Sequence, residues 1–241
     1  MSYTQTFLFG IYPYIALTIF LLGSLIRFDR EQYTWKSDSS QLLKRGQLRL
    51  GSNLFHIGVL FLFFGHFFGM LTPHYVYEPF MSSGAKQILA MVSGGIAGVL
   101  ALIGISILLH RRLTEPRIRA TTKPSDILIL LLLWLQLLLG MITLPFSFAH
   151  RQDAHAMLIL ASYLQGIATL APDASVLAGI DWPFKLHMLL GMTIFLLFPF
   201  SRLVHVWSGF ATVAYLFRPR QLVRSRRLNV PAGHNQPGRT A

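Results

Sequence analysis

The sequence predicts an all-α integral membrane protein with five transmembrane helices, its N-terminus outside and its C-terminus in the cytoplasm. Three observations predict this fold. First, 53% of the 241 residues are hydrophobic and only 12% are charged, about half the charged fraction of a soluble protein. Second, five charge-free stretches are each long enough, or nearly so, to cross a bilayer. Third, lysine and arginine gather on alternate connectors, as the positive-inside rule requires.

The charge-free stretches set the order of the elements. The first does not read as a cleaved signal peptide, because it lacks a basic start and its apolar run is too long. A shorter apolar stretch, 154–170, carries polar side chains and is predicted to be an interfacial helix. We expect one membrane domain over residues 1–227 and a disordered tail over 228–241, which is rich in proline, glycine and polar residues. The predicted spans are about 3–27, 50–73, 85–110, 126–149 and 183–208.

The distribution of basic residues decides the topology. Connector 27–49 holds six lysines and arginines, connector 110–124 holds five, and the tail from Arg202 holds seven. A sixth span at 154–170 would move the tail to the other side and spoil this bias. The net charge of +12 therefore reports membrane topology, and the predicted partner is the lipid bilayer and not nucleic acid. The opposite side carries only Lys86, Arg151 and Lys185.

Four histidines in the second and fifth spans carry the candidate chemistry. Ionisable side chains inside apolar helices are costly and are usually functional. Because the two helices run antiparallel, His56 can face His205 and His66 can face His187. A haem iron takes two axial nitrogens on opposite faces, and neutral imidazole suits it. We therefore expect two haem b groups between helices 2 and 5. They must be bound non-covalently, because the chain has no cysteine.

The helical spacing of these histidines fits imperfectly. His56 and His66 lie ~15 Å apart along a straight helix, whereas His187 and His205 lie ~27 Å apart, a mismatch of ~12 Å. The second interval is five full turns, which places both residues on one face. Helix tilt and a kink near Pro199 have to absorb the difference.

Other residues near these histidines are candidates for lesser roles. Gly65 and Gly69 would let a flat ring approach the backbone, although small residues at this spacing also serve helix packing. Arg112 and Arg202 could hold haem propionates, or could simply reach the membrane surface. Lys86 could bind a quinol oxygen or a propionate, or be an ordinary interfacial lysine.

Five segments carry a resemblance to a known family. They are FGIYPYIA at 9–16, QYTW at 32–35, SNLFHIGVLFLFFGHFFGMLTPH at 52–74, RIRATT at 117–122 and KLHMLLGMTIFLLFPFSRLVHVWS at 185–208. Through these segments the chain resembles, from about residue 9 to residue 227, the gamma subunit of bacterial respiratory nitrate reductase. The resemblance implies a five-span dihaem cytochrome b.

The resemblance implies roles for individual residues. His56 and His205 would ligate the haem proximal to the partner subunits, and His66 and His187 the distal haem. Quinol would be oxidised near the distal haem, with Lys86 helping to bind it. Gly65 and Gly69 match the family's segment beside that site.

The resemblance also implies partners and a location. The chain would anchor an iron–sulfur beta subunit and a molybdenum-containing alpha subunit on the cytoplasmic side of the bacterial inner membrane. It would draw electrons from the membrane quinone pool and release protons outside, and the chain itself would carry no nitrate-reducing site. Two alternatives stay open from the residues alone. One is the dihaem cytochrome b of a formate dehydrogenase or hydrogenase, and the other is a haem-free membrane anchor or transporter.

Overall fold

The computed structural model describes residues 2–31, 34–35, 45–149 and 154–209. The chain separates into two compact units, residues 1–205 and residues 206–241. All the labelled helices lie in the first unit. In the second unit, the described residues 206–209 are helical. The tail expected to be disordered, 228–241, lies outside the described residues.

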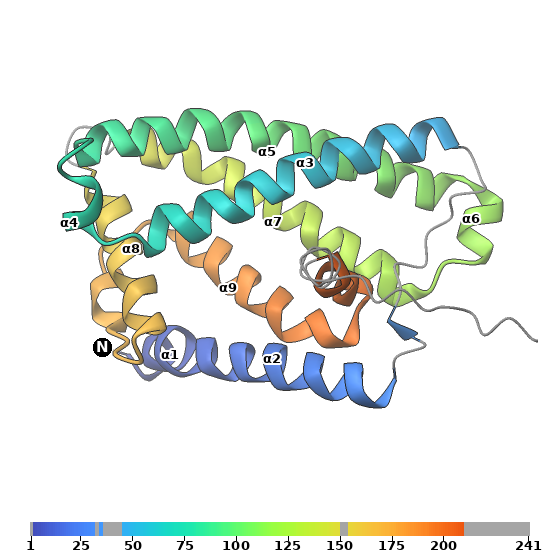
Figure 1. The fold of residues 1–241 in the computed structure, drawn as a ribbon, viewed down its shortest axis with the longest axis horizontal. Coiled ribbons are helices and arrows are strands. Elements are labelled where there is room, and N and C mark those ends of the chain that lie inside the picture. Colours follow the sequence, from blue (N-terminus) through green and yellow to red (C-terminus); the bar gives the residue numbers. More distant parts are fainter. Residues whose placement is uncertain (1, 32–33, 36–44, 150–153, 210–241) are drawn as a thin grey trace, which may run out of the picture. The chain divides into compact units, whose positions relative to one another are not determined.

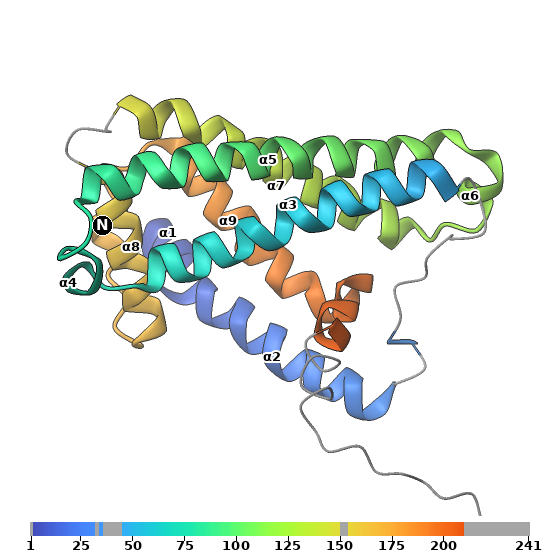
Figure 2. The same cartoon turned by 45° about the horizontal axis from the view of Figure 1, so that its top comes forward.

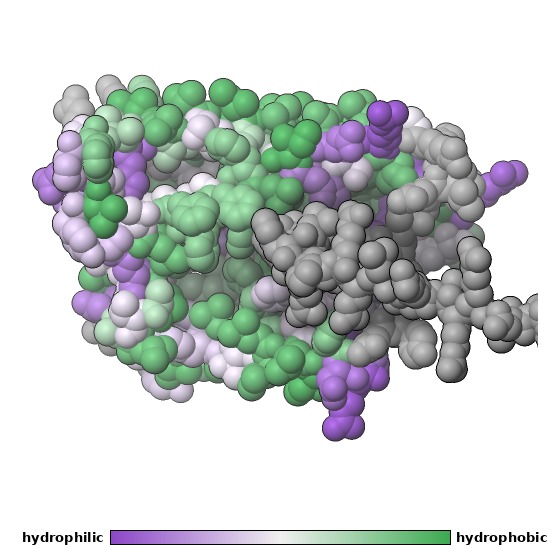
Figure 3. Space-filling view, viewed as in Figure 1, coloured by the Kyte–Doolittle hydropathy of each residue, from purple (hydrophilic) through white to green (hydrophobic). Residues whose placement is uncertain are grey.

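Five helices of the described chain are long and apolar enough to cross a membrane, as predicted. The first combines α1 (Tyr3–Thr6), the π-helical turn η1 (Phe7–Ile11) and α2 (Tyr12–Arg30). The other four spanning helices are α3 (Arg45–Leu71), α5 (Ser83–Thr114), α7 (Pro124–Ala149) and α9 (Trp182–Leu197), the last extended by η4 (Phe198–Phe200). On the face shown in Figure 3, hydrophobic residues cover much of the middle of the helices, and hydrophilic residues gather toward their ends.

Short helices connect the long ones. α4 (His74–Tyr77) links α3 to α5, and α6 (Pro116–Ala120) links α5 to α7. The 14-residue α8 (His155–Ala168) coincides with the apolar stretch predicted as an interfacial helix, and η3 (Ala174–Leu177) follows it.

Local sequence sets where several helices begin. The Ser82 hydroxyl accepts a hydrogen bond from the Ala85 amide at 3.3 Å, which caps the first turn of α5. Prolines occupy the first turns of α6 and α9, where their missing N–H would have no helical partner.

The long helices of the first unit pack in the order α3, α5, α7, α9, α2 (Figures 1 and 2). The tightest pair is α3 and α5, because glycines remove the side chains where the two backbones cross. A Cβ added to Gly58 would lie 2.7 Å from the Ala101 amide nitrogen, and one added to Gly104 would lie 2.8 Å from the Gly51 oxygen. Gly58, two residues after His56, thus lets the backbone of α5 approach α3.

A hydrophobic core closes one end of this unit, which we call the α8 end. Residues of α8 pack there against η1, η3 and the start of α9. The Tyr163 hydroxyl donates to the Phe9 carbonyl at 2.8 Å, and burial raises the pKa of this phenol, so it remains a donor. The Gln165 amide donates to the Met70 carbonyl at 2.9 Å, near the end of α3. Thus α8 joins the first two spanning helices.

The fifth span is not one continuous α-helix. Regular α-helix ends at Leu197, where Pro199 interrupts the hydrogen-bond ladder. Two 3₁₀ turns follow, η4 and η5 (Arg202–Val204), separated by Ser201 in extended conformation. This confirms the kink expected near Pro199. It also corrects the expectation that five regular turns place His187 and His205 on one helix face.

Candidate histidine-pair site

Two pairs of histidines face each other between α3 and the fifth span. The ring centres of His66 and His187 are 6.2 Å apart, and those of His56 and His205 are 6.3 Å apart. These are the two cross-pairs predicted from the antiparallel order of the helices. The break after Leu197 accommodates the unequal spacing along the two helices, because the regular helical rise stops before His205.

Backbone carbonyls orient three of the four imidazoles. The Nδ1–H groups of His56, His66 and His205 each donate to a carbonyl at 2.7 Å. A carbonyl can only accept, so Nδ1 carries the proton and Nε2 of a neutral ring keeps its lone pair. Such a second bond is the usual way in which a metal-binding histidine is fixed in tautomer and orientation. The acceptors are the carbonyls of Ser52, Leu62 and Arg202.

His187 is held differently. Gly140 on α7 leaves room for its ring, because an added Cβ would lie 3.1 Å from Cε1 of the imidazole. The Gln136 amide donates to the His187 carbonyl at 3.0 Å. Nδ1 of His187 is buried and has no hydrogen-bond partner among the described residues.

The separation of the rings matches a shared metal ion. Two imidazole nitrogens that bind one ion from opposite sides at about 2 Å place their ring centres about 6 Å apart. Within the described ranges, no three histidine or carboxylate side chains gather as a metal site. A pair of histidines alone leaves a coordination shell incomplete. A porphyrin, whose four nitrogens need only two axial partners, fits this donor set.

The end of the unit at which α7 begins, the Asp126 end, carries a buried ion pair. Nη1 of Arg112 lies 3.0 Å from Oδ2 of Asp126, and Nη1 of Arg202 lies 3.9 Å from the same oxygen. Both arginines named as propionate contacts therefore gather around one carboxylate. Two arginines and one aspartate carry one net positive charge, which could still attract a haem propionate. That role stays a prediction. Sequence reasoning missed Asp126.

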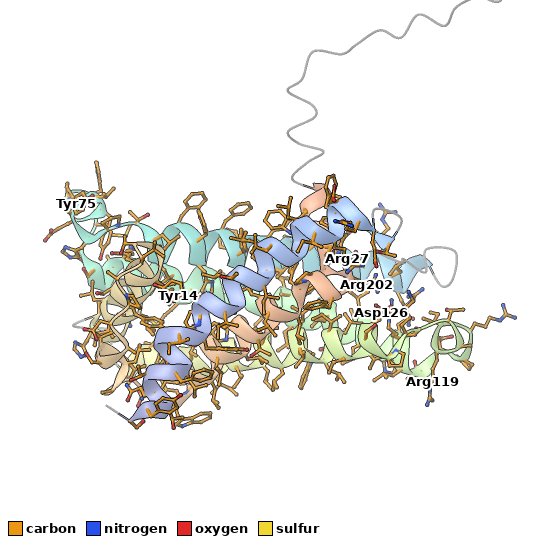
Figure 4. All side chains as sticks on the ribbon, turned by 90° about the horizontal axis from the view of Figure 1, so that it is seen from below. Tyr14, Arg27, Tyr75, Arg119, Asp126 and Arg202 are labelled. Atoms are coloured by element: carbon orange, nitrogen blue, oxygen red, sulfur yellow. The ribbon has the colours of Figure 1, made fainter. Side chains whose placement is uncertain are left out.

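Arg27 supports the break in the fifth span. Its Nη1 donates to the carbonyls of Pro199 at 2.6 Å and Ser201 at 2.9 Å. These carbonyls lie where the α-helical ladder has ended, so the guanidinium supplies donors in place of helical amides. Figure 4 shows Arg27, Arg202 and Asp126 at the same end, with Tyr75 at the opposite one. Sequence reasoning treated Arg27 only as a topology charge.

Lys86 lies in a small polar cluster at the start of α5. Its Nζ is 3.6 Å from the centre of the Tyr77 ring, a cation–π contact. The Tyr77 hydroxyl and His74 Nε2 both lie within hydrogen-bond distance of the Ser83 hydroxyl, at 3.2 and 2.9 Å. Lys86 is thus in contact with an aromatic side chain. Its role in binding quinol stays a prediction.

The two glycines beside His66 face open space. A Cβ added to Gly65 or Gly69 would meet no atom within 4 Å. Neither glycine is needed for helix packing among the described residues, in contrast to Gly58 and Gly104. The open surface is compatible with the approach of a flat ring or a lipid chain.

These features define a class: an all-helical membrane protein whose second and fifth spanning helices face each other through two histidine pairs. Within that class, the chain belongs to the nitrate reductase gamma subunit family, whose sequence model matches residues 5–226. The predicted resemblance is confirmed. The chain is therefore a subunit of a multi-subunit enzyme, respiratory nitrate reductase, in which it provides membrane helices.

Individual relatives agree with this assignment. The chain is 53% identical over 227 residues to the respiratory nitrate reductase 1 gamma chain of Escherichia coli K12, covering 94% of this chain and all of that one. It is equally similar to the respiratory nitrate reductase 2 gamma chain of the same organism. It is 39% identical over 220 residues to the nitrate reductase gamma chain of Bacillus subtilis 168, covering 91% of this chain and 97% of that one.

Proposed function

We propose that this chain is the dihaem cytochrome b of its complex. It would oxidise quinol on the outer side of the bacterial inner membrane and pass the electrons to an iron–sulfur subunit on the cytoplasmic side, where a molybdenum-containing subunit reduces nitrate. The observation that carries the proposal is the pair of ring separations, 6.2 and 6.3 Å, on two helices of a nitrate reductase gamma subunit. When bound, the haems would supply one-electron carriers across the membrane.

The residues of this chain divide that work. His66 and His187 would hold the distal haem, and His56 and His205 the proximal haem. The basic connectors 27–49 and 110–124 support placing the Asp126 end in the cytoplasm, next to the partner subunits. The α8 end then faces outward, where protons from quinol would be released.

The first test measures haem. The complex is purified in mild detergent, and its dithionite-reduced minus oxidised spectrum is recorded together with a pyridine haemochrome assay. We expect two b-type haems per gamma chain. Folded complex that was expressed with haem available and contains none would contradict the proposal and leave a haem-free anchor as the alternative.

Lys86 provides a separate prediction about quinol. Replacing it by alanine removes a cation whose charge-assisted hydrogen bond to a quinol oxygen is worth about 1.5–3 kcal/mol. We expect kcat/KM for a soluble quinol analogue to fall about 10–100-fold, with both haem spectra unchanged. Steady-state kinetics of the purified complex measure this.

Lys185→Ala is the matched control. Lys185 is the other lysine assigned to the outer side, and its Nζ lies 3.3 Å from the Ala178 carbonyl. We expect its kcat/KM to stay at the wild-type value. Equal losses in the two variants would show that general surface charge, and not a bond from Lys86, attracts the quinol.

A further inference from the structure

Asp126 is the most enclosed carboxylate of the described chain. It lies in the first turn of α7 and is 7% exposed. Its Oδ2 accepts a hydrogen bond from Arg112 Nη1 at 3.0 Å and lies 3.9 Å from Arg202 Nη1. Burying a carboxylate is costly unless it is paired, and the two guanidinium groups supply that pairing. Figure 4 shows Asp126 and Arg202 close together at one end of the unit.

Arg202 connects this carboxylate to a histidine pair. It begins η5, and its carbonyl accepts the hydrogen bond from His205 Nδ1 at 2.7 Å. The residue that sets the orientation of the His205 ring is therefore the residue whose side chain lies against Asp126. The segment is a 3₁₀ turn and not regular α-helix, and the Arg202 carbonyl also accepts a hydrogen bond from the backbone N–H of His205.

Arg27 holds the same segment from another side. It bonds the carbonyls of Pro199 and Ser201, the two residues that flank Phe200 just before Arg202. The backbone is thus held by α2 and the Arg202 side chain by α7. Arg27 contacts this segment through backbone carbonyls, whereas Asp126 contacts the side chain of Arg202.

We propose that Asp126 is a positioning residue for the His56–His205 pair. It fixes Arg202, and through the Arg202 carbonyl it fixes the ring of His205 and the basicity of Nε2. The inference rests on the proposed function, in which His205 binds a haem iron. It adds that the carboxylate tunes this haem and leaves the haem of His66 and His187 unaffected.

Charge gives the direction of the effect. Asp126, Arg112 and Arg202 together carry one positive charge. Neutralising the carboxylate leaves two positive charges. Added positive charge favours the reduced form of a nearby redox centre. We therefore expect the midpoint potential of the His56–His205 haem to rise in Asp126→Asn. If the variant displaces the Arg202 carbonyl, retention of the metal group should also weaken, by less than the about 10–100-fold that follows complete loss of such a histidine partner.

The experiment uses the complete complex carrying Asp126→Asn or Asp126→Glu. Haem content and optical redox titrations are measured, and His205→Ala and His66→Ala assign the two haem signals. The matched control is Asp29→Asn, the same change at an exposed ion pair with Arg30, which we expect to leave both haems as in wild type. Asp126→Glu keeps the charge and is expected to retain both haems, with a smaller change confined to the same haem.

The outcomes separate the inference from the proposed function. If His205→Ala removes no haem, the proposed function fails whatever Asp126 does. If it removes one haem, an effect of either Asp126 variant confined to that haem supports the positioning role. Equal effects on both haems, or none on either, overturn it, since a general folding role does not select one haem.

Discussion

Replacing His66 by alanine is expected to reduce the haem content of the complex from two b haems per gamma chain to about one. The ring of His66 lies 6.2 Å from that of His187, and its Nδ1 is already committed to the Leu62 carbonyl. No other described histidine faces His187 in this way, so the distal haem would lose half of its axial ligation. Quinol-driven nitrate reduction should fall by more than about 100-fold.

A spectrum separates this loss from unfolding. The haem signal that depends on His56 and His205 should remain, and the partner subunits should still co-purify. His74→Ala is the matched control, because His74 is an exposed histidine just beyond the end of α3 that pairs with Glu78 at 3.2 Å. It should keep two haems. Retention of both haems in His66→Ala, or loss of one in His74→Ala, would contradict the assignment.

Replacing Gly104 by alanine is expected to destabilise the fold by up to about 2 kcal/mol. The added Cβ would lie 2.8 Å from both the Gly51 oxygen and the Phe55 Cα, which are backbone atoms that cannot rotate away. Such overpacking costs about 1–3 kcal/mol and sometimes more, against a gain of about 1 kcal/mol in helix propensity. Because α3 carries His56 and His66, its displacement should also lower haem retention.

Gly94 on the same helix provides the comparison. A Cβ added there meets no atom within 4 Å, so Gly94→Ala should be neutral or stabilising by at most about 1 kcal/mol. The midpoint of thermal unfolding in detergent and the haem content after heating measure both variants. Equal stability of the two would show that α3 and α5 do not cross as closely as the structure places them.

The five spanning helices were predictable because a bilayer imposes one simple demand, a run of apolar residues long enough to cross it. The two histidine pairs were predictable for a similar reason, since antiparallel helices bring residues of matching depth together. Helical spacing alone left a ~12 Å mismatch between the pairs. The sequence predicted a kink near Pro199 but not its conformation. The way in which the fifth span absorbs the mismatch, through two 3₁₀ turns, therefore became known only from the structure.

Other features of the site depended on contacts between distant segments. Arg27 bonds the Pro199 carbonyl across 172 positions of sequence, and Asp126 joins arginines from α5 and the fifth span. Sequence reasoning also missed Gln136, although this residue was easier to find than Arg27 or Asp126. A lone amide side chain within the apolar fourth span is itself a sign of function. Its contact with His187 appears only when α7 packs on α9.

The sequence by itself determined the class of the protein, its five spans, the sidedness that its basic residues predict and, through the family, its membership of nitrate reductase. The class, the spans and the sidedness follow from composition, the length of the apolar runs and the placement of basic residues, whereas the family follows from the resemblance of long sequence segments. Tertiary structure decided which glycines bring α3 and α5 together, which side chains hold the break before His205, and which carboxylate the two arginines share. Such choices depend on how backbones cross and on which buried charges find partners, and no single segment contains that information.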